Sequence, residues 1–144
     1  MRATQSLLLA SLAGAVHAAT LADVCTVSTV TAALPSYLGI TVDASSVTAN
    51  AVYNASASGS VMFPDAVFDF CNVTFAYSHD GKSDRVVVAY WLPDPDNFKN
   101  RFLATGGGGY AINSGLTTGG SLPGGVSYGA VAGLTDGGFG SFCK

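Results

Sequence analysis

A Gly-x-Ser-x-Gly segment near the carboxyl end of the chain has the spacing of a nucleophile elbow, the turn that exposes a catalytic serine. It spans residues 125–129 and centres on Ser127. The elbow requires a strand before the serine and a helix after it, with an acid and a histidine later in the chain. Here a Leu-Pro-Gly segment typical of a loop precedes the motif, a strand-like run follows it, and no histidine comes after Ser127. We interpret the motif as a chance match; the alternative is a small esterase that uses Ser127 and His79.

His79 and the carboxyl-terminal lysine are the other side chains that could take part in acid–base or acyl-transfer chemistry. His79 lies beside Asp80 in a run of turn residues, and it is the only histidine after residue 18. We expect a solvated turn residue there. Ser141 and Lys144 have a Ser-x-x-Lys spacing, but Lys144 is the last residue and cannot be held rigidly. The pattern alone therefore assigns no catalytic role to either position.

Four consecutive glycines, Gly106, Gly107, Gly108 and Gly109, follow a strand-like segment at residues 101–105. Glycines let a loop adopt conformations that other residues avoid, and the bare backbone lets a substrate approach closely. In α/β-hydrolases a glycine-rich loop after an early strand donates one N–H group to the oxyanion hole. We interpret the four glycines as a candidate loop of this kind, with an ordinary glycine-rich turn as the alternative. A dinucleotide-binding interpretation fits the glycine spacing only loosely.

Three cysteines, Cys25, Cys71 and Cys143, indicate one disulfide and one remaining thiol in an oxidising compartment. We favour pairing of Cys25 with Cys71, because both lie in the well-patterned part of the chain. Closing that loop stabilises the fold by about 3–4 kcal/mol in the chain-entropy model. Cys143 then suggests a partner cysteine that this chain has lost, or an end that is not native. No two cysteines have metal-ligand spacing, so we expect no metal site.

The amino-terminal residues predict secretion. Arg2 precedes an apolar run at residues 7–16, which is too short to span a bilayer. The run closes on Ala18, after which we expect a signal peptidase to cut. Downstream of a signal peptide, the two Asn-x-Ser/Thr motifs at Asn54 and Asn72 predict surface glycans.

The charge balance argues against nucleic acid or an anionic membrane as a partner. The chain has six Lys and Arg residues against nine acids, a net charge of −3, and every acid is Asp. Partners of those two classes require a basic face, which this composition does not provide.

The elements that position these groups are predicted mainly by side-chain alternation. Residues 68–77 alternate apolar and polar side chains with period two, as a half-buried strand does. A turn is expected at residues 79–82. Residues 85–92 are more continuously apolar, which predicts a strand covered on both faces. A third strand at 101–105 runs into the four glycines, and a further buried strand is expected at 130–136.

The remaining segments are less regular. Residues 23–34 fit a short capped helix that ends before Pro35. Residues 40–42 and 47–52 read as irregular strands separated by loop. From Thr105 onward the sequence becomes dense in glycine, without any repeat period, which excludes collagen-like and solenoid architectures.

Several of these segments together resemble one family. The chain is similar to the N-terminal part of secreted fungal tannases and feruloyl esterases. The segments that carry the resemblance occur in the family's order and cover most of the chain after residue 18: residues 23–27, 70–74, 100–103 leading into 106–109, 128–131 and 135–138. Each segment is short, and their combination and order are what make the resemblance specific.

The resemblance implies the N-terminal part of an α/β-hydrolase fold, strand-rich and incomplete as given. It implies hydrolysis of phenolic-acid esters, such as gallates or ferulates, by a serine acyl-enzyme mechanism. The family's serine lies in a Cys-Ser-x-Gly-Gly motif, next to a cysteine that is bonded to the one beside the catalytic histidine. That motif and the triad are absent here and are expected beyond Lys144, as are the ligands of the calcium site in the family's lid.

The resemblance implies roles for two features that this chain does contain. The backbone of the glycine loop would form part of the oxyanion hole and the floor of the substrate site, and Cys25 and Cys71 would form a structural disulfide. The expected organisation is a signal peptide at residues 1–18 and a truncated hydrolase portion at residues 19–144. We expect this chain alone to be inactive, and a truncated gene model or a frameshift near residue 143 is the preferred explanation. The rival hypothesis is a non-enzymatic, glycosylated, secreted β-rich module.

Overall fold

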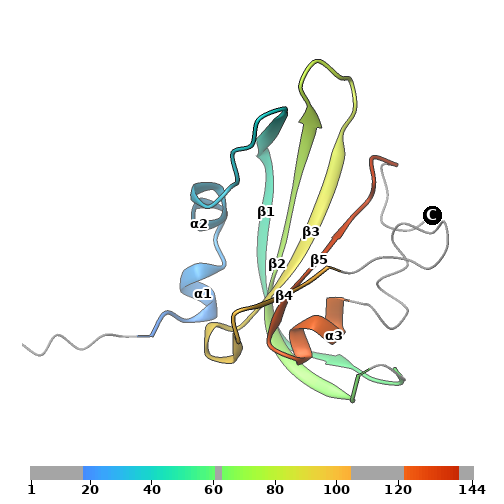
Figure 1. Ribbon diagram of the computed structural model, residues 1–144. Coiled ribbons are helices and arrows are strands. Elements are labelled where there is room, and N and C mark those ends of the chain that lie inside the picture. The colour runs from blue at the N-terminus through green and yellow to red at the C-terminus, as the bar shows by residue number, and fades with distance from the viewer. Residues whose placement is uncertain (1–17, 61–62, 105–121, 140–144) are drawn as a thin grey trace, which may run out of the picture.

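One mixed β-sheet with short helices on both faces forms the body of the computed structural model, which describes residues 18–60, 63–104 and 122–139. Helices α1 and α2 cover one face and α3 covers the other (Figure 1). The strand order is β1-β2-β3-β5-β4, in which only β4 and β5 are parallel neighbours. The elements in chain order are α1 (Leu21–Val24), α2 (Val27–Ala32), β1 (Ile40–Ala57), β2 (Ala66–His79), β3 (Val86–Pro93), a 3-10 helix (Pro95–Asn97), β4 (Arg101–Ala104), α3 (Leu122–Ser127) and β5 (Ala130–Thr135).

The hairpin of β2 and β3 confirms the two strands predicted at residues 68–77 and 85–92, and Gly81 takes a positive φ of 71° in the turn between them. Residues of β3 pack on both faces, as the apolar run predicted. Val88 joins the cluster beneath α1, whereas Ala89 packs with Leu122 of α3.

Strand β1 is one long strand, where the sequence suggested two irregular pieces separated by loop. Its pairing with β2 shifts register between Asp43 and Thr48. At the shift, the Asp43 carboxylate accepts a hydrogen bond from the Ser45 backbone at 3.0 Å, and the Ser46 hydroxyl accepts one from the Ala76 backbone at 2.8 Å. Side chains thus replace the ladder bonds that the bulge removes, which lets the strand continue.

The single helix predicted at residues 23–34 is wrong in detail, because the chain forms two short helices there. Thr20 and Asp23 make a reciprocal capping box at the start of α1. Thr26 then caps α2, and its hydroxyl accepts from the Thr29 backbone at 3.1 Å. A second capping residue directly after Cys25 therefore restarts the helix, and α2 ends before Pro35 as expected.

The segment expected to be a loop before Ser127 is instead the helix α3. Gly124 and Gly125 are buried in it. A Cβ on Gly125 would come within 2.6 Å of the Ala132 Cβ on β5, so the missing side chain lets the helix lie against the sheet. Packing therefore outweighs the poor helix propensity of glycine. Both strands flanking α3 agree with the sequence analysis, with β4 described to Ala104 and β5 ending at Thr135. Within the described ranges, no helix has the length and apolar character needed to cross a bilayer.

Candidate functional site

The structure describes the two elements that flank the candidate oxyanion-hole loop. Gly106, Gly107, Gly108 and Gly109 themselves lie outside the described residues. The chain enters this region from the carboxyl end of β4 at Ala104 and returns through α3 into β5. Since β4 and β5 are parallel, their connection is a crossover that passes a helix over one face of the sheet. The glycines thus follow the carboxyl end of a sheet strand, the edge where α/β folds place ligands.

Ser127 is the last residue of α3, and its hydroxyl donates to the Gly124 carbonyl at 2.9 Å. A helix precedes it, and β5 follows after a turn at Gly129, which has a φ of 72°. This order is the reverse of the strand and helix that a nucleophile elbow requires. The geometry agrees with the interpretation of the motif as a chance match.

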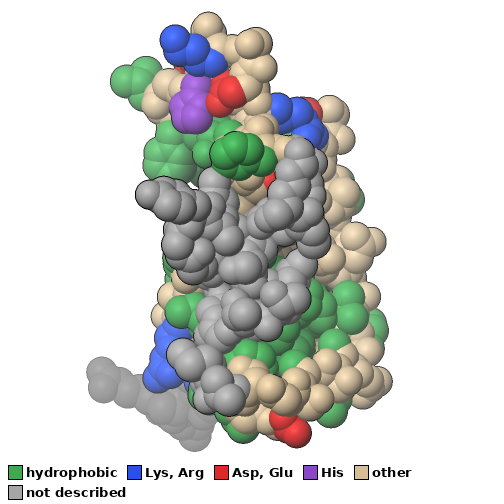
Figure 2. All heavy atoms as spheres, turned by 90° about the vertical axis from the view of Figure 1, so that its right-hand side faces the viewer, with side chains coloured by type: hydrophobic (Ala, Val, Ile, Leu, Met, Phe, Trp, Pro, Cys, Tyr) green, Lys and Arg blue, Asp and Glu red, His purple; other side chains and the backbone are tan. Residues whose placement is uncertain are grey.

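His79 is the last residue of β2, at the tip of the β2–β3 hairpin. Ser127 instead lines a small pocket with residues 66–69, at the opposite end of β2. The His79 Nδ1 lies 2.5 Å from a carboxylate oxygen of Asp84, and its backbone N–H donates to the other oxygen at 3.0 Å. These hydrogen bonds lower the pKa of the Asp84 carboxyl, the side-chain bond most strongly. On the neighbouring strand, Thr41 donates to Asp80 at 2.8 Å. Histidine, acidic and basic side chains gather at this end of the molecule (Figure 2).

A disulfide joins Cys25 to Cys71, the pair favoured by the sequence, with a Cα–Cα distance of 5.5 Å. It ties the turn between α1 and α2 to the middle of β2, and both cysteines belong to the core cluster that includes Leu21 and Val73. Cys143 lies outside the described residues. The bridge therefore anchors both amino-terminal helices to the sheet.

The two predicted glycosylation positions differ in accessibility. Asn54 is exposed on β1, with a φ of 54°, and its N–H donates to Asp69 at 2.7 Å. Asn72 is half-buried on β2, with Asn50 and Trp91 as its cross-strand neighbours. Asn54 is thus the more accessible acceptor.

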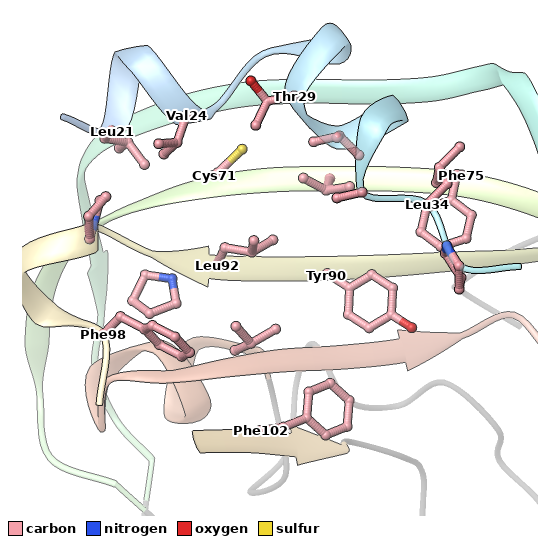
Figure 3. Close-up of a pocket in the computed structure, with 17 residues that line it drawn as sticks. Leu21, Val24, Thr29, Leu34, Cys71, Phe75, Tyr90, Leu92, Phe98 and Phe102 are labelled. Carbon is pink, nitrogen blue, oxygen red and sulfur yellow. The ribbon is translucent and has the colours of Figure 1, made fainter. Parts of the chain in front are cut away.

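An apolar groove of about 540 Å³ opens between the amino-terminal helices and the sheet. Figure 3 shows Leu34 approaching from the segment after α2, Phe75 and Tyr90 from the sheet, and Phe98 and Phe102 from the far side. The Tyr90 ring lies 5.9 Å from that of Phe75 and 6.2 Å from that of Phe102, between ring centres. Burial raises the pKa of the Tyr90 phenol, with smaller contributions from Tyr77 and Tyr37. The lining carries no charged side chain among the described residues.

The sequence analysis missed this groove. Its walls come from segments far apart in the chain, including α1, α2, the central strands and β4. One local signal was available. Val88, Tyr90 and Leu92 alternate along β3, which predicts that all three side chains, the Tyr90 ring included, lie on the same face of the sheet. Among the described residues, no cluster of His, Cys or Asp side chains could hold a metal ion.

Comparison with known proteins gives related sequences and a related solved structure, although no family model matches. The chain is 46% identical to a tannase from Aspergillus oryzae over 145 residues, which cover 99% of this chain and 23% of that protein. A probable feruloyl esterase from Arthroderma benhamiae is 49% identical over 51 residues, which cover 35% of this chain and 10% of that protein. The structure of a tannin acyl hydrolase from Aspergillus niger superposes with a TM-score of 0.79 at 57% identity, over 85% of this chain and 22% of that one. The chain therefore spans less than a quarter of the length of these relatives.

Proposed function

We infer that this chain, which belongs to the tannase and feruloyl esterase family, is the oxyanion-loop portion of a secreted enzyme that hydrolyses esters of phenolic acids. The observation that carries this proposal is the identity of 46% along 99% of the chain. At that identity the two proteins are expected to share a backbone, which supports the assignment of this chain to the same kind of enzyme.

The crossover of β4, α3 and β5 supports an α/β-hydrolase fold. In that fold, the loop between an early strand and the following helix supplies an oxyanion-hole N–H group. Gly106, Gly107, Gly108 and Gly109 stand between β4 and α3 in this chain. Their role in the reaction is to stabilise the negative charge on the carbonyl oxygen when the nucleophile attacks.

The nucleophile, general base and orienting acid are proposed to come from polypeptide outside these 144 residues. The chain holds no Cys-Ser-x-Gly-Gly segment, and Ser127 and His79 lie at opposite ends of strand β2. The acyl-enzyme route needs a serine, a histidine and an acid held together. The chain on its own is therefore proposed to be without esterase activity.

A chimera tests the proposal. Residues 19–144 replace the aligned segment of the Aspergillus oryzae tannase, and hydrolysis of a gallate ester and a ferulate ester is measured. We expect the chimera to hydrolyse at least one of them. Alanine keeps the backbone N–H, but its Cβ should disturb the conformation of the loop and hinder the approach of the substrate. Alanine at each of the four glycines should therefore lower kcat, at most by the roughly 100- to 1000-fold that the loss of one oxyanion-hole donor causes.

Ser127→Ala in the same chimera is the matched control. It should leave kcat and KM within about twofold of the parent, because Ser127 takes no part in the mechanism. A folded chimera without activity on any phenolic ester would overturn the proposal. Loss of activity with Ser127→Ala would instead favour the small-esterase alternative.

A further inference from the structure

We propose that the glycan predicted at Asn72 packs on the sheet, with its first N-acetylglucosamine unit lying against the indole ring of Trp91. The glycan then acts as an additional packing element of the fold. The proposal concerns Asn72 and not the other predicted acceptor, Asn54. It rests on secretion, which is part of the proposed function, and it is independent of ester hydrolysis.

The acceptor side chain lies on the face of the sheet that carries α3. Its neighbours Cys71 and Val73 belong to the core cluster on the opposite face, beneath α1 and α2. Because side chains alternate along a strand, both Asn72 and Thr74 of the acceptor motif point to the α3 face. The Thr74 hydroxyl lies 2.7 Å from that of Thr48 on β1. The acceptor motif is therefore displayed on a regular, paired part of the sheet.

The Asn72 amide reaches solvent although the residue is half-buried. In the described part of the chain, no buried side-chain nitrogen or oxygen lacks a hydrogen-bond partner. The Asn72 amide makes no hydrogen bond to a described residue, so its atoms are accessible. On a strand a side chain stands roughly perpendicular to the sheet, so the exposed part is the tip, where a glycan is attached. A sugar on this nitrogen therefore breaks no hydrogen bond within the described residues.

Asn72 has a polar neighbour on one side and an aromatic neighbour on the other. Asn50 of β1 and Trp91 of β3 are its direct cross-strand partners, and the Cβ atoms in such pairs lie about 4.5–5.5 Å apart. Asn50 is exposed and Trp91 is half-buried. Phe70 stacks against the indole ring, with 4.0 Å between ring centres, and holds it in position. A sugar attached to Asn72 thus starts within reach of both neighbours.

N-acetylglucosamine has the amphipathic character that these two neighbours require. The C–H groups on the faces of its pyranose ring carry partial positive charge, and the negative face of an aromatic ring attracts them. Its hydroxyl and acetamide groups can exchange hydrogen bonds with the Asn50 amide, which both donates and accepts. Contact with the accessible part of Trp91 also removes apolar surface from water.

Asn54 has different surroundings and provides the matched control. It is exposed and lies in the register shift between Val52 and Ala55, without a cross-strand partner among the described residues. Trp91, the only tryptophan of the chain, pairs with Asn72 and not with Asn54. A glycan at Asn54 therefore projects into solvent and should leave the environment of the indole ring unchanged.

Fluorescence of the single tryptophan tests the proposal. The 144-residue chain is secreted from a yeast host, its glycans are trimmed to one N-acetylglucosamine unit, and mass spectrometry measures the occupancy of both acceptors. Acrylamide quenching of Trp91 and the Tm are then compared with those of Asn72→Gln and Asn54→Gln. We expect an occupied Asn72, and in Asn72→Gln stronger quenching and a Tm lower by about 2–6 °C. Asn54→Gln should change neither quantity.

An unoccupied Asn72, or quenching that is the same with and without its glycan, would overturn the proposal. A lower Tm with unchanged quenching would overturn it in favour of a general effect of glycans on the unfolded chain. If Asn72→Gln does not fold, nuclear Overhauser contacts between the acetyl methyl group and the Trp91 ring in the wild-type chain provide the test, and their absence would contradict the proposal. A glycan that shields Trp91 in a chain whose chimera hydrolyses no ester supports this inference and counts against the proposed function alone.

Discussion

Asp136 illustrates how one buried side chain can fix the end of a strand. It is 1% exposed at the end of β5, and its carboxylate accepts hydrogen bonds from the backbone N–H groups of Val87 and Gly138, each at 2.8 Å. Its own N–H donates to the Val87 carbonyl at 2.9 Å. The side chain thus joins the start of β3 to the turn that follows β5.

Replacing Asp136 by alanine should lower the free energy of unfolding by about 1–3 kcal/mol, because the part-buried hydrogen bonds from the Val87 and Gly138 N–H groups lose their acceptor. The change is measured by urea unfolding. Asp136→Asn retains an acceptor oxygen and should cost clearly less. Equal losses for the two variants would show that the negative charge, rather than hydrogen bonding, determines the effect.

Asp84 predicts a dependence of stability on acid pH. Its pKa is lowered in the folded chain, above all by the bond to the His79 ring, so the contribution of the carboxylate is present above its ordinary pKa of about 4. That contribution declines as the pH falls through the lowered value. Wild type should therefore be more stable than Asp84→Asn near pH 6, and the two should converge in strong acid. Unfolding midpoints across pH measure this; a difference that persists at the lowest pH would contradict it.

At the scale of elements, the sequence analysis succeeded where structure depends on local pattern. The alternation at residues 68–77 specifies which side chains of β2 face the core, and no distant information is needed. It failed for α3, whose two glycines are acceptable in a helix because Phe63 lies directly against Gly124 and Ala132 against Gly125. It also failed to join the two pieces of β1, because side chains at residues 43–46 supply hydrogen bonds that no periodicity reveals.

The close packing of α3 against β5 predicts that a destabilising substitution in α3 can be partly compensated by a second substitution in β5. Gly125→Ala should lower the free energy of unfolding by about 1–3 kcal/mol, because the new methyl group collides with the Ala132 Cβ. The gain in helix propensity, about 1 kcal/mol, only partly offsets this cost. Adding Ala132→Gly should recover part of the loss, with a coupling energy of at least about 0.5 kcal/mol. Strict additivity in thermal or urea unfolding would show that the two positions do not meet.

At the scale of the whole molecule, the disulfide fastens α1 and α2 to the sheet across a sequence separation of 46 residues. Replacing Cys25 and Cys71 together by alanine should lower the free energy of unfolding by about 3–4 kcal/mol, since the unfolded chain regains its freedom. Urea unfolding of oxidised and reduced protein measures the same quantity. Unchanged stability on reduction would argue that core packing alone holds the helices.

The candidate site could be predicted only in part. The four glycines are contiguous in sequence, so their chemistry is visible there, although they lie outside the described residues. The groove was not visible, because residues from α1 to β5 assemble it only when the sheet forms. The sequence motif at Ser127 could be rejected beforehand, since histidine never follows it.

The strand order also has a consequence for synthesis on the ribosome. Strands β1, β2 and β3 are neighbours in both chain and sheet, so they can pair as they emerge. Strand β4 leaves the ribosome before β5 but can join the sheet only beside it, because β5 lies between β3 and β4. At ordinary translation rates the edge of β3 that pairs with β5 therefore remains unpaired for a time on the order of seconds, until β5 has been synthesised. A chaperone or a pause in translation acting in that interval would influence the yield of folded protein more than the same event earlier or later.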